Sequence, residues 1–130
     1  MIGIDTNVLV RYLTQDEPKQ AAKANRLIDH ELSPNEPGFI TLISLVEVAW
    51  LLESCYAQPK DKIVEVLHAL LTTRQLLVEN ADMAYLAMKR YVTGSADFSD
   101  ALIAVISEHR GCGSIVTFDK KGKSIGMTVL

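Results

Sequence analysis

The spacing of apolar residues along the chain predicts helices that alternate with short strands. Within 60–73, apolar residues recur every three or four positions, as in an amphipathic helix. Short β-branched runs such as 114–118 (SIVTF) are instead typical of buried strands. The predicted helices are 6–15, 18–32, 42–56, 60–73, 81–92 and 97–109, and the predicted strands are 2–4, 39–40, 76–79, 114–118 and 127–130. We expect strand 2–4 and helix 42–56 to be buried as well.

This alternation predicts an α/β sandwich formed by a single domain over residues 1–130. Strands separated by helices pair mainly in parallel, so we expect a central sheet of four to five strands flanked by helices. Sites in such sheets gather beyond the carboxyl ends of the strands. Asp5 follows strand 2–4 and Asp119 follows strand 114–118. If these strands are parallel neighbours, both aspartates lie at one edge.

Composition places the chain among ordinary globular proteins, with 48% apolar and 22% charged residues and a net charge of −3. That charge is not typical of a nucleic-acid-binding protein. An enzyme with an acidic site that binds cations can still act on phosphate groups, even if its net charge is negative. The opening MIGIDTN lacks the basic start of a signal peptide, and Glu47 interrupts the apolar run 40–52. We therefore expect no membrane segment and a cytoplasmic location. Cys55 and Cys112 fit no metal spacing and are expected to be buried or unreactive.

The acidic residues carry the candidate chemistry. Glu47 lies inside the apolar stretch 41–52 (TLISLVEVAWLL), where an ionised carboxylate needs a partner, a metal or a proton. Four further acids stand near a strand end or a helix start: Asp5, Asp97, Asp100 and Asp119. Clustered carboxylates repel one another, and their oxygens suit hard cations such as Mg²⁺ or Mn²⁺. Such ions support phosphodiester hydrolysis.

Each of these acids also has a purely structural interpretation. Aspartate is favoured at helix N-caps and turns, and glutamate completes a capping box. The matching patterns are an N-cap at Asp5, capping boxes at Ser44–Glu47 and Asp97–Asp100, and a turn start at Asp119. An N-cap at Ser44 would leave the apolar Leu42 and Ile43 outside the helix, which favours a metal-facing Glu47.

Three segments together resemble the PIN domain family, and more narrowly its VapC-type ribonuclease toxins. They are 4–13 (IDTNVLVRYL), 44–52 (SLVEVAWLL) and 96–121 (ADFSDALIAVISEHRGCGSIVTFDKK), in the family's order. The resemblance implies a PIN-like three-layer sandwich and an endoribonuclease that depends on Mg²⁺ or Mn²⁺. It also implies an RNA substrate, a cognate antitoxin and a homodimer.

The resemblance further implies roles for individual residues. Catalytic metal ligands would be Asp5, Glu47, Asp100 and Asp119, with Asp97 as an auxiliary ligand and Thr6, Asn7 and Thr117 in support. Candidates for RNA contacts are Arg11, Arg110 and Lys120. A catalytically idle PIN-like binding module stays open as an alternative. A Mg²⁺-binding receiver-like domain is less favoured, because Thr6 and Asn7 follow Asp5 where such domains place another acid.

Overall fold

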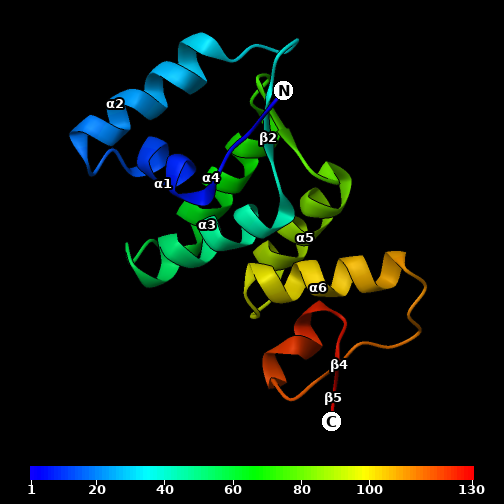
Figure 1. Cartoon of the computed structure of the whole chain (residues 1–130). Helices are drawn as coiled ribbons and strands as arrows, with labels where there is room; N and C mark the ends of the chain where they lie inside the picture. Colours follow the sequence, from blue (N-terminus) through cyan, green and yellow to red (C-terminus); the bar gives the residue numbers. More distant parts are fainter. The chain divides into compact units, whose positions relative to one another are not determined.

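The computed structural model describes all 130 residues, which form two compact units, Met1–Glu79 and Asn80–Leu130 (Figure 1). The first unit contains β1 (Ile2–Gly3), α1 (Thr6–Thr14), α2 (Pro18–Arg26) with a π-helical extension η1 (Leu27–Glu31), β2 (Gly38–Ile40), α3 (Leu42–Ser54), α4 (Lys60–Thr72) and β3 (Leu76–Val78). The second contains α5 (Ala81–Thr93), α6 (Phe98–His109), β4 (Val116–Thr117), a 3₁₀-helix η2 (Lys120–Ile125) and β5 (Thr128–Val129).

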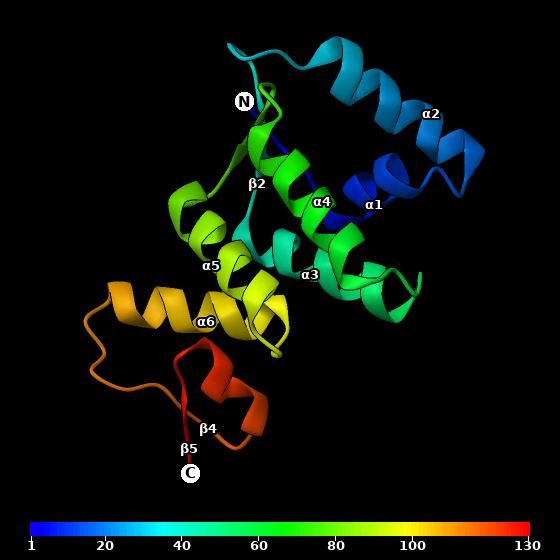
Figure 2. The same ribbon diagram turned by 180° about the vertical axis from the view of Figure 1, so that it is seen from behind.

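The first unit is organised around a parallel sheet in the order β1-β2-β3. Gly3 pairs with Phe39, and Ile40 pairs with Val78. Helices separate the strands in sequence, as parallel pairing requires. Figures 1 and 2 show α1 and α2 as neighbouring helices in this unit. Its core includes the fully buried Leu9, Ile28, Ile40, Leu45 and Leu67.

The second unit packs α5 against α6 and pairs β4 with β5 in a parallel two-stranded ladder. Tyr91 and Phe98 meet edge to face, with ring centroids 6.1 Å apart. Arg90 pairs with Glu108 and also donates to the Ile125 carbonyl at 3.2 Å. That side chain therefore links α5, α6 and the end of η2.

The predicted elements and the α/β class with parallel strands are confirmed, but three details differ. The expected central sheet of four to five strands is instead one sheet of three strands and one of two. The strand before Asp119 pairs with β5, whereas the strand before Asp5 pairs with β2. The 3₁₀-helix η2 follows Asp119 where only a turn was expected.

None of the helices combines the length and apolar character needed to cross a bilayer.

Burial was overestimated at several positions. Ile2 of β1, and Val116 and Phe118 in and after β4, are exposed, because each of these strands has a neighbour on only one side. Helix α3 buries one face and exposes the other. Cys55 and Cys112 are both exposed free thiols, so the expectation of burial is wrong for them.

Gly38 allows β2 to pack closely. A Cβ atom there would lie 2.3 Å from Cδ1 of Ile4 and 2.8 Å from Cδ1 of Leu32. We expect Gly38→Ala to lower the free energy of unfolding by about 1–3 kcal/mol, because overpacking forces neighbours to shift. The measurement is urea denaturation. Gly3→Ala is the control, since its Cβ would meet nothing within 4 Å. Equal midpoints for the two variants would contradict this account of β2.

Candidate active site

The carboxyl ends of β1 and β2 place two helix starts side by side. Continuing the pairing of Gly3 with Phe39 by two residues brings Asp5 level with Thr41. Asp5 is the N-cap of α1, and its Oδ1 accepts from the Thr6 backbone N–H at 2.8 Å. Thr41 is the N-cap of α3, and its Oγ1 accepts from the Ser44 N–H at 3.1 Å. The capping interpretation of Asp5 is confirmed, and that of Ser44 is wrong.

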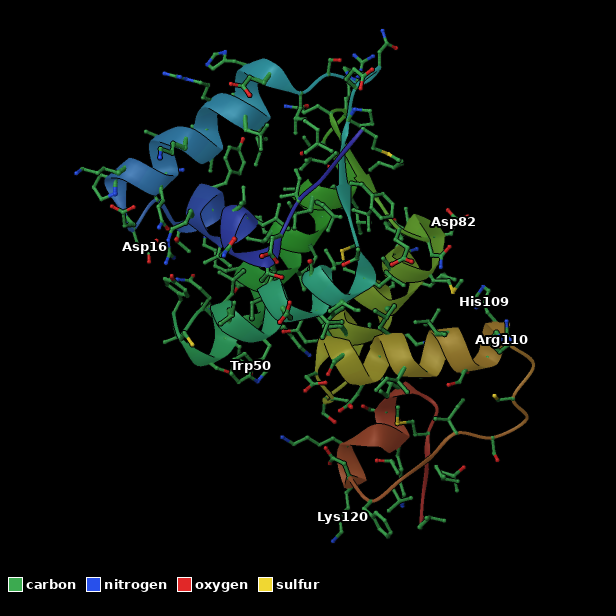
Figure 3. The ribbon with its side chains drawn as sticks, in the orientation of Figure 1. Asp16, Trp50, Asp82, His109, Arg110 and Lys120 are labelled. Carbon is green, nitrogen blue, oxygen red and sulfur yellow. The ribbon has the colours of Figure 1, made fainter.

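The partner of Glu47 is a threonine of the neighbouring helix. The buried Thr6 donates its Oγ1 hydrogen to Oε1 of Glu47 at 2.7 Å. Glu47 lies on an exposed stripe of α3 with Ile43 and Trp50, which are 73% and 59% exposed. Figure 3 shows Trp50 on this helix. The expectation of a poorly solvated Glu47 is therefore wrong. The helical period places the buried residues Leu45, Val48 and Leu52 on the other face.

Asp5 and Glu47 line one open cavity of about 590 Å³ in the first unit. Thr6 and Asn7 also line it, as do Arg11 and Tyr56. The ion pairs of the structure involve other carboxylates, those of Asp16, Glu36, Glu65 and Glu108. The carboxylates of Asp5 and Glu47 thus face this cavity without forming an ion pair to a protein cation, which is an arrangement expected of oxygen ligands for a hard ion.

The second unit gathers three acids around the start of α6. Asp97 is the N-cap, and its Oδ1 accepts from the Asp100 backbone N–H and from Ser99 Oγ, each at 2.9 Å. Asp119 follows β4 and starts η2, where its Oδ1 accepts from the Lys121 N–H at 2.9 Å. Thr117 Oγ1 accepts from the Asp119 N–H at 3.0 Å, so it fixes the backbone of that aspartate.

The surroundings of Asp100 favour its protonated form. Burial, then the charge of Asp97, a hydrogen bond with Asp97 and the charge of Asp119 raise the pKa of Asp100 to about 6. The Asp100 carboxyl group thus interacts electrostatically with both Asp97 and Asp119. A positive charge placed among these acids would favour ionisation of Asp100, as expected at a cation site.

The donor set of each unit suits an oxygen-coordinated ion but is incomplete. Neither unit alone brings three or more Asp, Glu, His or Cys side chains close enough to hold a metal. Asp5 and Glu47 in one unit, and Asp97, Asp100 and Asp119 in the other, each supply only carboxylate oxygens. This chemistry fits Mg²⁺ or Mn²⁺ better than zinc.

The candidate RNA contacts differ in their relation to these acids. Arg11 lines the cavity of Asp5 and Glu47. Lys120 is the first residue of η2, next to Asp119 (Figure 3). Arg110 caps the opposite end of α6 from Asp100, roughly 15 Å along the helix axis. The structure therefore does not group Arg110 with the acids of its own unit.

Two positions near the first acid group were missed from the sequence. Glu79 follows β3, and its Oε1 accepts from the Leu42 N–H at 2.9 Å, so it anchors the start of α3. The rule that functional residues gather after the carboxyl ends of parallel strands could have pointed to Glu79, but it was applied only to Asp5 and Asp119. Tyr56 lines the cavity from beyond the end of α3, and no sequence pattern pointed to it.

The PIN domain family model matches residues 2–126. The chain belongs to the PIN domain family. It is also similar to a protein of Aquifex aeolicus (strain VF5) described as "VapC ribonuclease". The two are 25% identical over 123 residues, which cover 95% of this chain and 90% of the relative. The family resemblance and the fold class drawn from the sequence are thus confirmed, and the receiver-like alternative is not supported.

In this PIN domain, we expect Asp97→Asn to lower the pKa of Asp100 from about 6 toward its ordinary value. The substitution removes a negative charge while the amide oxygen can still cap α6. Burial of Asp100 remains, so its pKa should stay somewhat raised. Carboxyl-carbon NMR titration of the metal-free protein measures this. Asp82→Asn, an exposed acid in the first turn of α5, is the control and should leave the titration of Asp100 unchanged.

The same pKa predicts a pH dependence of stability. The folded protein holds the Asp100 proton more tightly than the unfolded chain, so the free energy of unfolding should fall as pH rises from about 4 to about 6. Asp100→Asn should flatten this part of the stability curve. Thermal melts across that range test it, and a curve identical to that of the wild type would contradict the raised pKa.

The Thr6–Glu47 hydrogen bond should stabilise the first unit. Thr6→Val keeps the shape of the side chain but removes the donor, so we expect the free energy of unfolding to fall by about 1–2 kcal/mol. Thr6→Ser keeps the hydroxyl and should lose less. Urea denaturation compares the two variants. A Val variant as stable as the Ser variant would show that this bond contributes nothing.

Proposed function

We propose that this PIN domain is an endoribonuclease that depends on Mg²⁺ or Mn²⁺ and acts as the toxin of a toxin–antitoxin pair. The proposal rests above all on the cavity that Asp5 and Glu47 share, because neither carboxylate forms an ion pair there. Family membership and the name of the Aquifex relative support the same reaction class.

The chain would work as one nuclease domain over residues 1–130, with both acid groups serving one reaction. Asp5, Glu47, Asp100 and Asp119 would hold the metal, with Asp97 as an auxiliary ligand. A divalent ion bound there would supply a more acidic water and stabilise negative charge on the phosphate.

The chain's own residues would hold the ligands in place. Thr6 fixes one oxygen of Glu47 and leaves the other free, and the start of α1 fixes one oxygen of Asp5. Asn7 would present its amide to the cavity that it lines. Thr117 would support Asp119 through the backbone bond already described. Such preorganised ligands need not reorganise when the reaction takes place.

Phosphate contacts would position the RNA without selecting its sequence. Arg11 is the best-supported contact, because it lines the cavity of Asp5 and Glu47. Lys120 would act beside Asp119, and Arg110 would contact a more distant phosphate. The cognate antitoxin and a homodimer follow from the resemblance and stay predictions. The cytoplasmic location stays a prediction as well.

The test is cleavage of total RNA by the purified protein, with Mg²⁺, with Mn²⁺ and with excess chelator. We expect discrete fragments only when metal is present. Asp5→Asn should reduce the cleavage rate by about 100-fold or more, because it removes a ligand charge from the site.

Asp61→Asn is the matched control. Asp61 is also an exposed aspartate whose Oδ1 accepts from the N–H of the next residue, at 3.0 Å, but it does not line the cavity. The Asp61→Asn variant should cleave RNA at the same rate as the wild type. A folded Asp5→Asn variant with full activity would refute the assignment, and an inactive wild type with metal bound would favour the idle binding module.

A further inference from the structure

A second cavity adjoins the one that contains Asp5 and Glu47. It has a volume of about 280 Å³ and lies between α1 and the α2–η1 helix, with Val8, Lys23 and Leu27 among its lining residues. Asn7 and Arg11 line both cavities. Asn7 and Arg11 therefore stand at the border of both cavities, and Lys23 lies on the far side of Arg11 from the acid pair.

Arg11 is held at this junction by one short bond and two long ones. Its Nε donates to Gln20 Oε1 at 2.8 Å. Its Nη1 lies 3.3 Å from Asp16 Oδ1 and 3.4 Å from the Tyr56 hydroxyl, both longer than the 2.7–2.9 Å usual for charge-assisted bonds. The guanidinium is thus oriented mainly by a neutral amide, and no protein acceptor takes its Nη2.

Asp16 is occupied by other donors as well. The Tyr56 hydroxyl donates to its Oδ2 at 2.6 Å and Thr14 Oγ1 donates to its Oδ1 at 2.7 Å. These bonds, first that of Tyr56 and then that of Thr14, lower the pKa of Asp16 below its usual value. Because Asp16 already accepts these two short hydrogen bonds, we expect it to compete only weakly with an outside anion for the Arg11 guanidinium. The Arg11 side chain is also 30% exposed, so an outside anion can reach it.

Lys23 offers a second cation along the same path. It is exposed on α2 and takes part in none of the ion pairs of the structure. Between the two cations the cavity wall includes the apolar Val8 and Leu27. Cations that lack a tight acidic partner, spaced along a groove that starts at a carboxylate pair, suit a polyanion whose backbone continues beyond the reacting phosphate.

We propose that Arg11 and Lys23 bind backbone phosphates of the RNA strand on one side of the bond that is cleaved. This proposal rests on the proposed ribonuclease function. It specifies that the RNA strand runs along the groove between α1 and α2. Lys23 has no role in the acidic site, and Tyr56 and Gln20 act as positioning residues for Arg11.

The test is metal-free binding, which separates this proposal from the question of cleavage. Fluorescence anisotropy would follow a short, labelled, single-stranded RNA of mixed sequence binding to the full chain that carries Asp5→Asn, in excess chelator. Arg11→Gln and Lys23→Gln should each weaken binding by about fivefold to tenfold at low salt. Each should also reduce the slope of log K against log salt by about 0.7, the value for one lost phosphate contact with a single strand.

Arg74→Gln and Lys19→Gln are the matched controls. Both residues are exposed cations of the same unit that line neither cavity. Tyr56→Phe should weaken binding less than Arg11→Gln, and it should not change the slope, because the phosphate contact itself remains. Thermal melts would establish that each variant is folded, and Lys23→Gln, a surface change, tests the path even if Arg11→Gln unfolds the chain.

The outcomes distinguish the two proposals. Unchanged affinity and salt slope in folded Arg11→Gln and Lys23→Gln would overturn the strand path, even if the wild type cleaves RNA. Equal losses in the two control variants would also overturn it, because the effect would then be general charge attraction. Losses confined to Arg11 and Lys23 would support the path, whether or not the wild type proves to cleave RNA with metal.

Discussion

Parallel pairing of β1 with β2 is the constraint on which the first unit depends. Parallel strands end at the same edge, so the helices that follow them start side by side. Asp5 and Thr41 cap those helices at level positions, and Thr6, one residue later, reaches Glu47 one turn into α3. The close approach at Gly38 keeps β2 against Ile4 and Leu32. The acid pair is thus a consequence of strand order and packing.

Three of the candidate acids have structural roles that are compatible with the proposed chemistry. Asp5 and Asp97 cap helices, and Asp119 caps η2. An N-cap needs one carboxylate oxygen, which leaves the other oxygen free for a ligand. The structural and functional interpretations of these residues are therefore compatible, and capping orients the carboxylates before any ion arrives. In the second unit, burial and then the charges of Asp97 and Asp119 raise the pKa of Asp100.

The surroundings of the first acid pair distinguish two kinds of polar contact. Thr6 contacts Glu47 directly and fixes it within the cavity. Arg11 and Tyr56 border the same cavity, and both bond to Asp16, Tyr56 at 2.6 Å and Arg11 only at 3.3 Å. A cation held in this way is oriented yet available. Two carboxylates and an oriented cation at one cavity would suit the proposed phosphodiester substrate, which would need both a metal site and a means of alignment.

The sequence by itself determined the element types, the α/β class and the four acids, because helical periodicity, β-branched runs and capping residues are local signals. It also carried the PIN family resemblance through three short segments in the right order. Only the tertiary structure decided that Glu47 is exposed and bound to Thr6, 41 residues away in sequence, and that β4 pairs with β5. It also placed Arg11 between two cavities and Arg110 far along α6 from Asp100. These features depend on which faces of separate elements meet, and a local pattern of residues does not encode that.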